Sequence, residues 1–121
     1  MKKIFILFIG LFLLPLTLHA EDFKEGKHYK VISQTGTEKP EVLEFFSFYC
    51  PHCFKFEPLM EKLAQDLPSD VTIKKSHVNF LGGAMADEVT KAYAAADLLD
   101  VKEEVTSIIF DRIHTQRKAI N

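Results

Sequence analysis

Both cysteines of the chain stand in the segment SFYCPHCF, residues 47–54, with Pro51 and His52 between Cys50 and Cys53. A cysteine pair at this spacing can bind a metal ion, form a structural disulfide, or exchange electrons with other thiols. Each use needs different surroundings, so the rest of the sequence must decide among them.

Metal binding and a structural disulfide are both poorly supported. A structural zinc ion takes four ligands and one CxxC supplies two. The chain has no second CxxC, and His28, His77 and His114 show no ligand spacing. A disulfide across two intervening residues closes too small a loop to restrict the unfolded chain much. Both alternatives stay open, but the sequence favours thiol–disulfide exchange.

The cysteine pair follows an expected strand and opens an expected helix. Residues 41–48, EVLEFFSF, are apolar and aromatic apart from Glu44, which is typical of a buried strand. Residues 51–68 repeat apolar residues at helical spacing, and Pro51 suits the first turn because its missing N–H would be unpaired there. Cys50 therefore stands at the junction of strand and helix.

The rest of the chain predicts further strands and helices. A second strand is expected over residues 70–80, a turn at 81–83, and helices over 84–100 and 101–116; residues 28–33 have the composition of a short edge strand. The order strand, helix, strand predicts a parallel pair joined by a crossover. The expected fold class is α/β.

A thiol at the start of a helix is expected to be acidic, because the unpaired N–H groups and the helix dipole there favour negative charge. The pKa of Cys50 should therefore lie below the ~8.5 of a free cysteine, and His52 can add a hydrogen bond or positive charge. Cys53, one turn further in, should be more buried and less acidic. This asymmetry suits a dithiol–disulfide exchange in which a substrate thiolate attacks Cys50.

Glu44 is the other informative residue, because a carboxyl group inside an apolar strand is costly unless it is hydrated, paired or protonated. It precedes Cys50 by six residues, an even spacing that places it on the strand face shared with residues near the active-site end. One interpretation is a buried acid that moves protons to or from Cys53. The other is a carboxyl at a sheet edge paired by a lysine.

The first twenty residues have the pattern of a secretory signal peptide cleaved after about Ala20: two lysines, an apolar run, and acids directly after the cleavage site. A transmembrane anchor is the alternative, but the run is shorter than the ~20 residues of a spanning helix and Pro15 interrupts it. Export would permit disulfides. Without these residues the formal net charge changes from −2 to −4, which argues against nucleic acid as the main partner.

At this point the sequence resembles a known family. VLEFFSFYCPHC, then FEPLMEKL and HVNFLGG, are similar to the DsbA family of periplasmic thiol:disulfide oxidoreductases, which have a thioredoxin fold. The Pro-His dipeptide inside the CxxC differs from the Gly-Pro of thioredoxins, and the similarity runs from about residue 22 to the end. The DsbA family is itself the standard example of a low-pKa cysteine and a strongly oxidising disulfide.

The resemblance implies roles for seven residues. They are Cys50 as nucleophile, Cys53 as buried resolving cysteine, Pro51 and His52 as residues that tune the reduction potential, and Glu44, Glu57 and Lys75 as one proton-handling network. For Glu57 and Lys75, ordinary solvated charge is the alternative.

The resemblance also implies partners and a compartment. The partners would be unfolded or reduced exported proteins and a quinone-linked inner-membrane protein that reoxidises the cysteine pair. The compartment would be the periplasm, and the protein would be a monomer that needs no cofactor besides its redox-active disulfide. A non-catalytic thioredoxin-like remnant, or an interaction or zinc-binding module, is the alternative function.

The expected organisation is a signal peptide at 1–20, the N-terminal part of a thioredoxin-like domain at 21–83, and the beginning of a helical insertion at 84–121. A thioredoxin fold places a cis-proline opposite the CxxC on a later strand, and none of the five prolines can fill that position. We therefore expect an incomplete thioredoxin-like fold, truncated after the start of the insertion. Its open sheet edge and exposed core should make it fold poorly alone.

Overall fold

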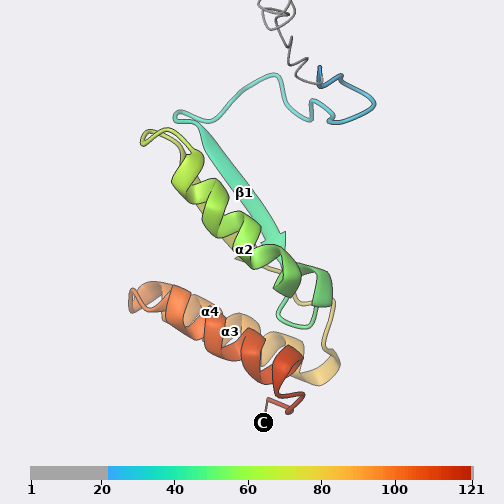
Figure 1. The fold of residues 1–121 in the computed structure, drawn as a ribbon, viewed down its shortest axis with the longest axis vertical. Helices are drawn as coiled ribbons and strands as arrows, with labels where there is room; N and C mark the ends of the chain where they lie inside the picture. Colours follow the sequence, from blue (N-terminus) through green and yellow to red (C-terminus); the bar gives the residue numbers. More distant parts are fainter. Residues whose placement is uncertain (1–21, 121) are drawn as a thin grey trace, which may run out of the picture. The chain divides into compact units, whose positions relative to one another are not determined.

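The computed structural model describes residues 22–120 of the chain (Figure 1). The chain divides into two units, Met1–Gly36 and Thr37–Asn121. The expected signal peptide and its cleavage after Ala20 lie outside the described residues. The expected division of the chain near residue 83 stays a prediction.

Residues 22–36 of the first unit form turns rather than a strand. Glu25 and Tyr29 make an isolated bridge around a turn in which Gly26 has a φ of 81°. The short edge strand predicted for residues 28–33 is therefore wrong. A strand needs a neighbour that pairs its N–H and C=O groups along its length, and the described residues of this unit offer only the single bridge.

The second unit contains a two-stranded parallel sheet. β1 (Glu41–Phe46) pairs in register with β2 (Thr72–His77) along its whole length. The predicted parallel pair is confirmed, and both strands lie within their predicted ranges. β1 ends before the predicted limit because residues 47–50 form a turn, in which the Cys50 N–H donates to the Ser47 carbonyl at 3.0 Å.

Helix α2 (Pro51–Asp66) follows this turn and runs alongside β1 (Figure 1). Pro51 occupies the first turn, as predicted, and Cys50 is the N-cap residue. The helix ends at its C-cap Leu67, directly before Pro68, because proline disfavours a helical conformation in the residue before it.

Two further helices follow β2 and lie side by side (Figure 1). A short 3₁₀ turn, η2 (Gly83–Met85), leads into α3 (Ala86–Leu98), and α4 (Lys102–Phe110) continues into a π-helical turn, η3 (Asp111–Thr115). The two helices predicted here are confirmed in type and approximate range. The π-helical turn at the end of the second was not predicted.

The core lies at the carboxyl end of β1, where α3 and α4 meet the sheet. Its buried side chains are Phe46, Phe48, Val89, Tyr93, Ile109 and Phe110. The Phe46 ring contacts those of Phe48 and Tyr93 edge-on at 5.2 Å, the geometry that aromatic quadrupoles favour. This cluster ties the turn before Cys50 to both C-terminal helices.

The two faces of the sheet differ in burial. Phe46 is 1% exposed, and Glu44 on the same face is partly buried, whereas Leu43 and Phe45 on the other face are 46% and 66% exposed. The strand that was predicted to be buried is therefore covered on its Phe46 face only. The cause is that α2, α3 and α4 all contact the Phe46 face.

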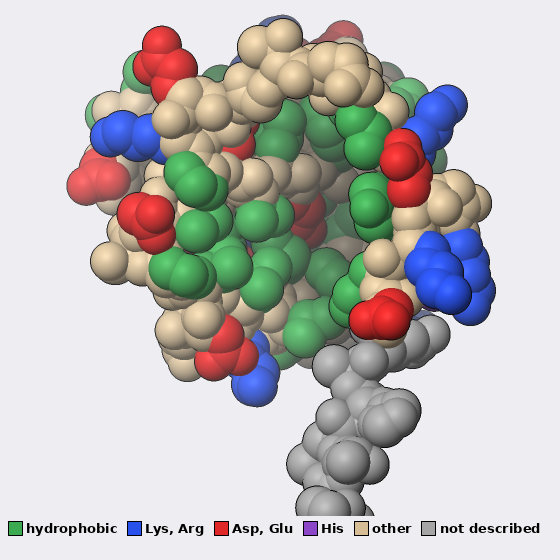
Figure 2. Space-filling view, turned by 90° about the horizontal axis from the view of Figure 1, so that it is seen from above, with side chains coloured by type: hydrophobic (Ala, Val, Ile, Leu, Met, Phe, Trp, Pro, Cys, Tyr) green, Lys and Arg blue, Asp and Glu red, His purple; other side chains and the backbone are tan. Residues whose placement is uncertain are grey.

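Apolar and charged side chains are both present on the surface. In the space-filling view, apolar side chains gather over the middle of the face shown, and acidic and basic side chains stand around them (Figure 2). Among residues 22–120, no helix is long and apolar enough to span a membrane.

Candidate active site

The sulfur of Cys50 lies at the open N-terminus of α2. The Cys50 backbone is extended (φ −93°, ψ 110°), and its Sγ accepts a hydrogen bond from the Cys53 N–H at 3.3 Å. Both cysteines are partly buried free thiols. The structure thus places the CxxC at the strand-to-helix junction, as its sequence context predicts.

The two thiols have pKa values shifted in opposite directions. A hydrogen bond from the Cys53 thiol lowers the pKa of Cys50, and the backbone N–H groups of Cys53 and His52 lower it further against the opposing effect of burial. Burial raises the pKa of Cys53, as do its hydrogen bond to Cys50 and the charge of Glu44. In the reduced pair, Cys50 is therefore the group that ionises first.

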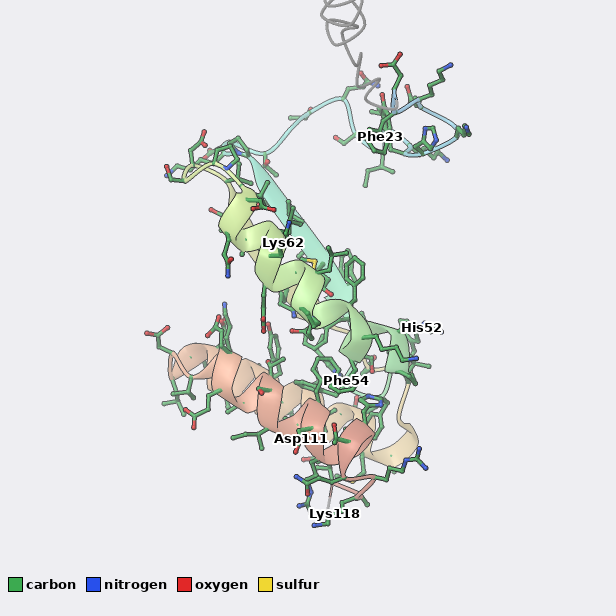
Figure 3. All side chains as sticks on the ribbon, in the orientation of Figure 1. Phe23, His52, Phe54, Lys62, Asp111 and Lys118 are labelled. Atoms are coloured by element: carbon green, nitrogen blue, oxygen red, sulfur yellow. The ribbon has the colours of Figure 1, made fainter. Side chains whose placement is uncertain are left out.

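Pro51 and His52 are both exposed at the start of α2 (Figure 3). Within residues 22–120 the His52 ring makes no hydrogen bond or ion pair, and His52 acts on Cys50 through its backbone N–H. The side-chain hydrogen bond that the sequence allowed is therefore not formed. The Cys53 thiol, which the sequence did not indicate as a donor, lowers the pKa of Cys50 more than His52 does.

Glu44, Glu57 and Lys75 form one ion-pair cluster. Lys75 Nζ lies 2.5 Å from Glu57 Oε1 and 3.3 Å from Glu44 Oε2, and all three side chains are at most 20% exposed. Glu44 Oε2 is buried and has no hydrogen bond of good geometry within the described chain, in spite of the nearby lysine. Glu57 and Lys75 are thus not ordinary solvated charges. Lys75 pairs Glu44, and the charge of Glu44 raises the pKa of Cys53, but a role for Glu44 in moving protons stays a prediction.

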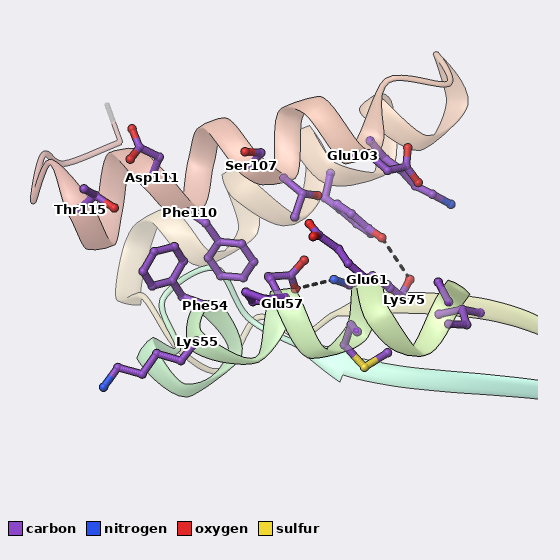
Figure 4. Close-up of a pocket in the computed structure, with 17 residues that line it drawn as sticks. Phe54, Lys55, Glu57, Glu61, Lys75, Glu103, Ser107, Phe110, Asp111 and Thr115 are labelled. Carbon is purple, nitrogen blue, oxygen red and sulfur yellow. Dashed lines mark hydrogen bonds and ion pairs between the residues drawn. The ribbon is translucent and has the colours of Figure 1, made fainter. Parts of the chain in front are cut away.

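A cleft of about 740 Å³ lies between α2 and α4 (Figure 4). Glu57 of α2 and Lys75 of β2 line it, together with the apolar side chains of Phe54 and Phe110. The cleft gives the Glu57–Lys75 pair access to solvent.

Other residues hold the turn before Cys50, and the sequence did not assign them to the site. The Phe48 N–H donates to His77 Nε2 at 3.1 Å, and the Phe48 carbonyl accepts from His114 Nε2 at 2.7 Å. The ring of Tyr49 lies against Gly82 so closely that a Cβ there would be 2.1 Å from Tyr49 Cδ2. His77 was predicted only to end a strand. The only sequence feature that pointed to these residues was the HVNFLGG segment, which contains His77 and Gly82 and resembles the family.

A strand, a CxxC at the start of the following helix, and a parallel second strand define the thioredoxin-like class of dithiol proteins. The model of the DSBA-like thioredoxin domain matches residues 41–121, and the chain belongs to this family. The predicted α/β thioredoxin-like fold and the predicted family are both confirmed.

The relatives are proteins named "thiol:disulfide interchange protein DsbA". The one from Escherichia coli is 39% identical over 116 residues, which cover 93% of this chain and 55% of the relative. The one from Haemophilus influenzae is 41% identical over 117 residues, which cover 92% and 56%. The chain therefore spans about half the length of the curated relatives it matches.

Solved structures give the same assignment. DsbA from Klebsiella pneumoniae superposes with a TM-score of 0.71 at 30% identity, covering 84% of this chain and 55% of that one. A serine variant of Proteus mirabilis DsbA, in non-covalent complex with the peptide PWATCDS, superposes with a TM-score of 0.72 at 33% identity and the same coverage. The roles of the individual site residues stay predictions.

Proposed function

We propose that the chain is a thiol:disulfide oxidoreductase whose oxidised Cys50–Cys53 pair donates its disulfide to exported proteins. The observation that supports this most is the opposite shift of the two thiol pKa values within one helical turn. A pair of this kind has one sulfur that leaves readily as a thiolate and one that readily takes up a proton.

The proposed reaction has two exchange steps. A substrate thiolate attacks Cys50 Sγ, the Cys50–Cys53 bond breaks, and Cys53 leaves as a thiolate that takes up a proton. A second substrate thiolate then attacks the substrate sulfur of the mixed disulfide, and Cys50 leaves as a thiolate. The substrate loses two electrons and gains a disulfide, while the cysteine pair is reduced.

The residues around the pair have proposed roles in these steps. Pro51 and His52 tune the potential from their exposed positions beside Cys50. Glu44, with Glu57 and Lys75, handles the proton that Cys53 takes up. This is supported by the effect of the Glu44 charge on the pKa of Cys53 and by the cleft beside the Glu57–Lys75 pair.

Substrates, partner and compartment extend the proposal. Reduced exported proteins would be the substrates, which agrees with a relative bound to a cysteine-containing peptide. The signal-like residues 1–20 would direct the chain to the periplasm. A quinone-linked inner-membrane protein would reoxidise the pair, and the protein would act as a monomer with no cofactor other than its disulfide.

Alkylation of the reduced protein over a range of pH tests the proposed function. We expect iodoacetamide to modify Cys50 at acidic pH while Cys53 stays unmodified, as peptide mass mapping would show. We also expect the Cys50 thiolate of Cys53→Ser to attack a disulfide-linked peptide dimer, release one peptide thiol and accumulate a mixed disulfide, and Cys50→Ser to form none. Equal, slow alkylation of both cysteines near pH 7 would contradict the proposal.

A further inference from the structure

Two histidines bind the peptide groups of one residue, Phe48, which lies two positions before Cys50. His77 Nε2 accepts the Phe48 N–H at 3.1 Å, and His114 Nε2 lies 2.7 Å from the Phe48 carbonyl oxygen. The Phe48 side chain is fully buried in the core. We call His77 and His114 the histidine clamp.

The hydrogen bonds fix the protonation of the clamp. A backbone N–H can only donate, so His77 Nε2 carries no proton. The Thr90 hydroxyl donates to the Ala86 carbonyl at 2.8 Å, so His77 Nδ1, 2.7 Å from Thr90 Oγ1, must donate to that oxygen. A carbonyl can only accept, so His114 Nε2 carries a proton. The two Nε2 atoms are therefore in opposite states.

Packing holds each ring in place. His77 is 9% exposed, and its ring centroid lies 4.9 Å from that of Phe48. The His114 ring stacks on Phe54 of α2 at 5.1 Å with an interplanar angle of 14°. His114 belongs to the π-helical turn η3. A π turn contains one residue more than an α turn, so the side chains that follow are rotated by about 100° around the helix axis.

We propose that the histidine clamp positions the Cys50 thiolate for exchange. The turn from Ser47 to Cys50 is short, and the Cys50 and Tyr49 N–H groups both donate to Ser47. A displacement of Phe48 therefore moves Cys50 relative to the N–H groups at the start of α2. The clamp connects this turn to β2 on one side and to η3 on the other. Its consequence for exchange rests on the proposed function, but its geometry does not.

Few charged groups face the clamp. Tyr93 of α3 faces His77, and Lys75 of β2 lies over the neighbouring Phe46 ring, 4.8 Å from its centroid. His114 faces the uncharged Phe54 ring, and Asp111 on its own turn bonds the Gln116 amide. Burial lowers the pKa of His77, which favours the neutral ring that the clamp requires. A protonated His77 would carry an N–H at Nε2 that faces the Phe48 N–H, and the hydrogen bond between them would be lost.

Nuclear magnetic resonance of the uniformly ¹⁵N-labelled full-length protein tests the clamp without a mutation. At neutral pH we expect His77 to be protonated at Nδ1 only and His114 to be protonated at Nε2. We also expect a scalar coupling between the Phe48 amide nitrogen and His77 Nε2. A proton on His77 Nε2, or none on His114 Nε2, would overturn the proposal whatever the outcome of the alkylation experiment.

Variants of the full-length protein test the consequence for Cys50. His77→Leu should slow Cys50 alkylation below its pKa by about two- to tenfold, as loss of one hydrogen bond implies. His77→Gln should retain more of the rate, because its amide oxygen can accept the Phe48 N–H. Val89→Ala is the matched control: it creates a defect in the same core but removes no bond to Phe48, and it should leave the rate unchanged. Equal rates in His77→Leu and Val89→Ala would overturn the proposal.

Substitutions of His114 separate the hydrogen bond from the ring contact. His114→Gln keeps an N–H donor for the Phe48 carbonyl and loses the ring. His114→Phe keeps the stacking on Phe54 and loses the donor. We expect near-normal Cys50 alkylation in His114→Gln and slower alkylation in His114→Phe. The reverse order would show that packing matters rather than the clamp, and would overturn the proposal.

Discussion

At the scale of single residues, the acidity of Cys50 depends first on its own partner in the pair. The Cys53 thiol is the strongest influence that lowers the pKa of Cys50, ahead of the backbone N–H groups at the helix start. Cys53 therefore has two proposed roles: it is the leaving thiolate when a substrate thiolate attacks Cys50, and, while protonated, it stabilises the Cys50 thiolate.

Cys53→Ala should raise the pKa of Cys50, because the thiol that donates to the Cys50 thiolate is removed. We expect Cys50 alkylation at acidic pH to slow by about two- to tenfold, the usual worth of one hydrogen bond. Cys53→Ser is the matched variant, since its hydroxyl can still donate. Stopped-flow alkylation at several pH values measures both. Identical profiles for the two variants would show that the thiol is not the donor.

Glu44→Gln should lower the pKa of Cys53, because the negative charge of Glu44 raises it. The pH dependence of Cys53 alkylation in a Cys50→Ala background measures this shift. Glu41→Gln is the control, since Glu41 belongs to the same strand but pairs with Lys74. If both glutamine variants leave the Cys53 profile unchanged, Glu44 does not act on the inner thiol.

At the scale of elements, the turn before α2 depends on a glycine that is remote in sequence. Gly82 precedes η2 with a φ of 106°, and the Tyr49 ring occupies the space where its Cβ would lie. Only glycine adopts this conformation freely and allows this contact. The residue directly before Cys50 is thus placed by the loop that follows β2.

Gly82→Ala should destabilise the protein by about 2 kcal/mol or more, because the strain of a positive φ adds to the displacement of Tyr49. Gly83→Ala is the matched control. Its φ is 59°, but nothing lies within 4 Å of the position of an added Cβ. Gly83→Ala should therefore lower the free energy of unfolding only by the backbone strain of a positive φ, about 1 kcal/mol. Urea unfolding of the full-length protein gives both values. Equal losses would show that the Tyr49 contact does not matter.

The elements and the CxxC could be predicted because their signals are local. Pro51 marks the first turn of α2, and the run before Cys50 marks β1. The histidine clamp could not be predicted, because His77 and His114 lie 29 and 66 residues from Phe48. The periodicity of a helix does not reveal which peptide group a distant ring will meet. The donor role of the Cys53 thiol could not be predicted for another reason: the CxxC spacing does not show whether the inner thiol points its hydrogen toward Cys50 Sγ.

At the scale of the whole molecule, the apolar residues on the open sheet face are an aggregation risk. Leu43 and Phe45 are both large and exposed among the described residues. The sequence predicted a buried strand here but not which face would be covered, because composition does not show on which side the helices will pack. The exposed side chains are consistent with the expectation that residues 21–121 alone fold poorly.

The double variant Leu43→Thr, Phe45→Thr should reduce aggregation of the isolated residues 21–121. Threonine keeps the strand preference and removes apolar surface, so we expect light scattering at a fixed concentration to fall by about twofold or more. Phe46→Thr on the covered face is the control and should increase scattering, because it opens the core. Unchanged scattering in the double variant would show that this face does not drive association.

The stability of the reduced form relative to the oxidised form should depend on pH in a defined direction. The folded-state pKa of Cys50 is lowered, so its stabilising contribution is present above the unfolded value of about 8.5 and is lost as pH falls through the folded pKa. The pKa of Cys53 is raised, so its contribution is lost as pH rises through its own folded pKa. The advantage of the reduced form should therefore peak near pH ~8.5.

Thermal unfolding of both forms of the full-length protein between pH 5 and pH 10 measures this dependence. His77 titrates in both forms. Because its pKa is lowered in the folded protein, the stability of each form falls as pH drops from about 6.5 to the folded-state pKa of His77. This loss is the same in both forms, so it does not appear in the difference between their stabilities. The Cys50→Ala variant cannot form the disulfide, so it is compared with the reduced unmutated protein, and its stability should lack the rise toward pH ~8.5. A difference between the two forms that stays constant across this range would contradict the assignment of Cys50 as the stabilised thiolate.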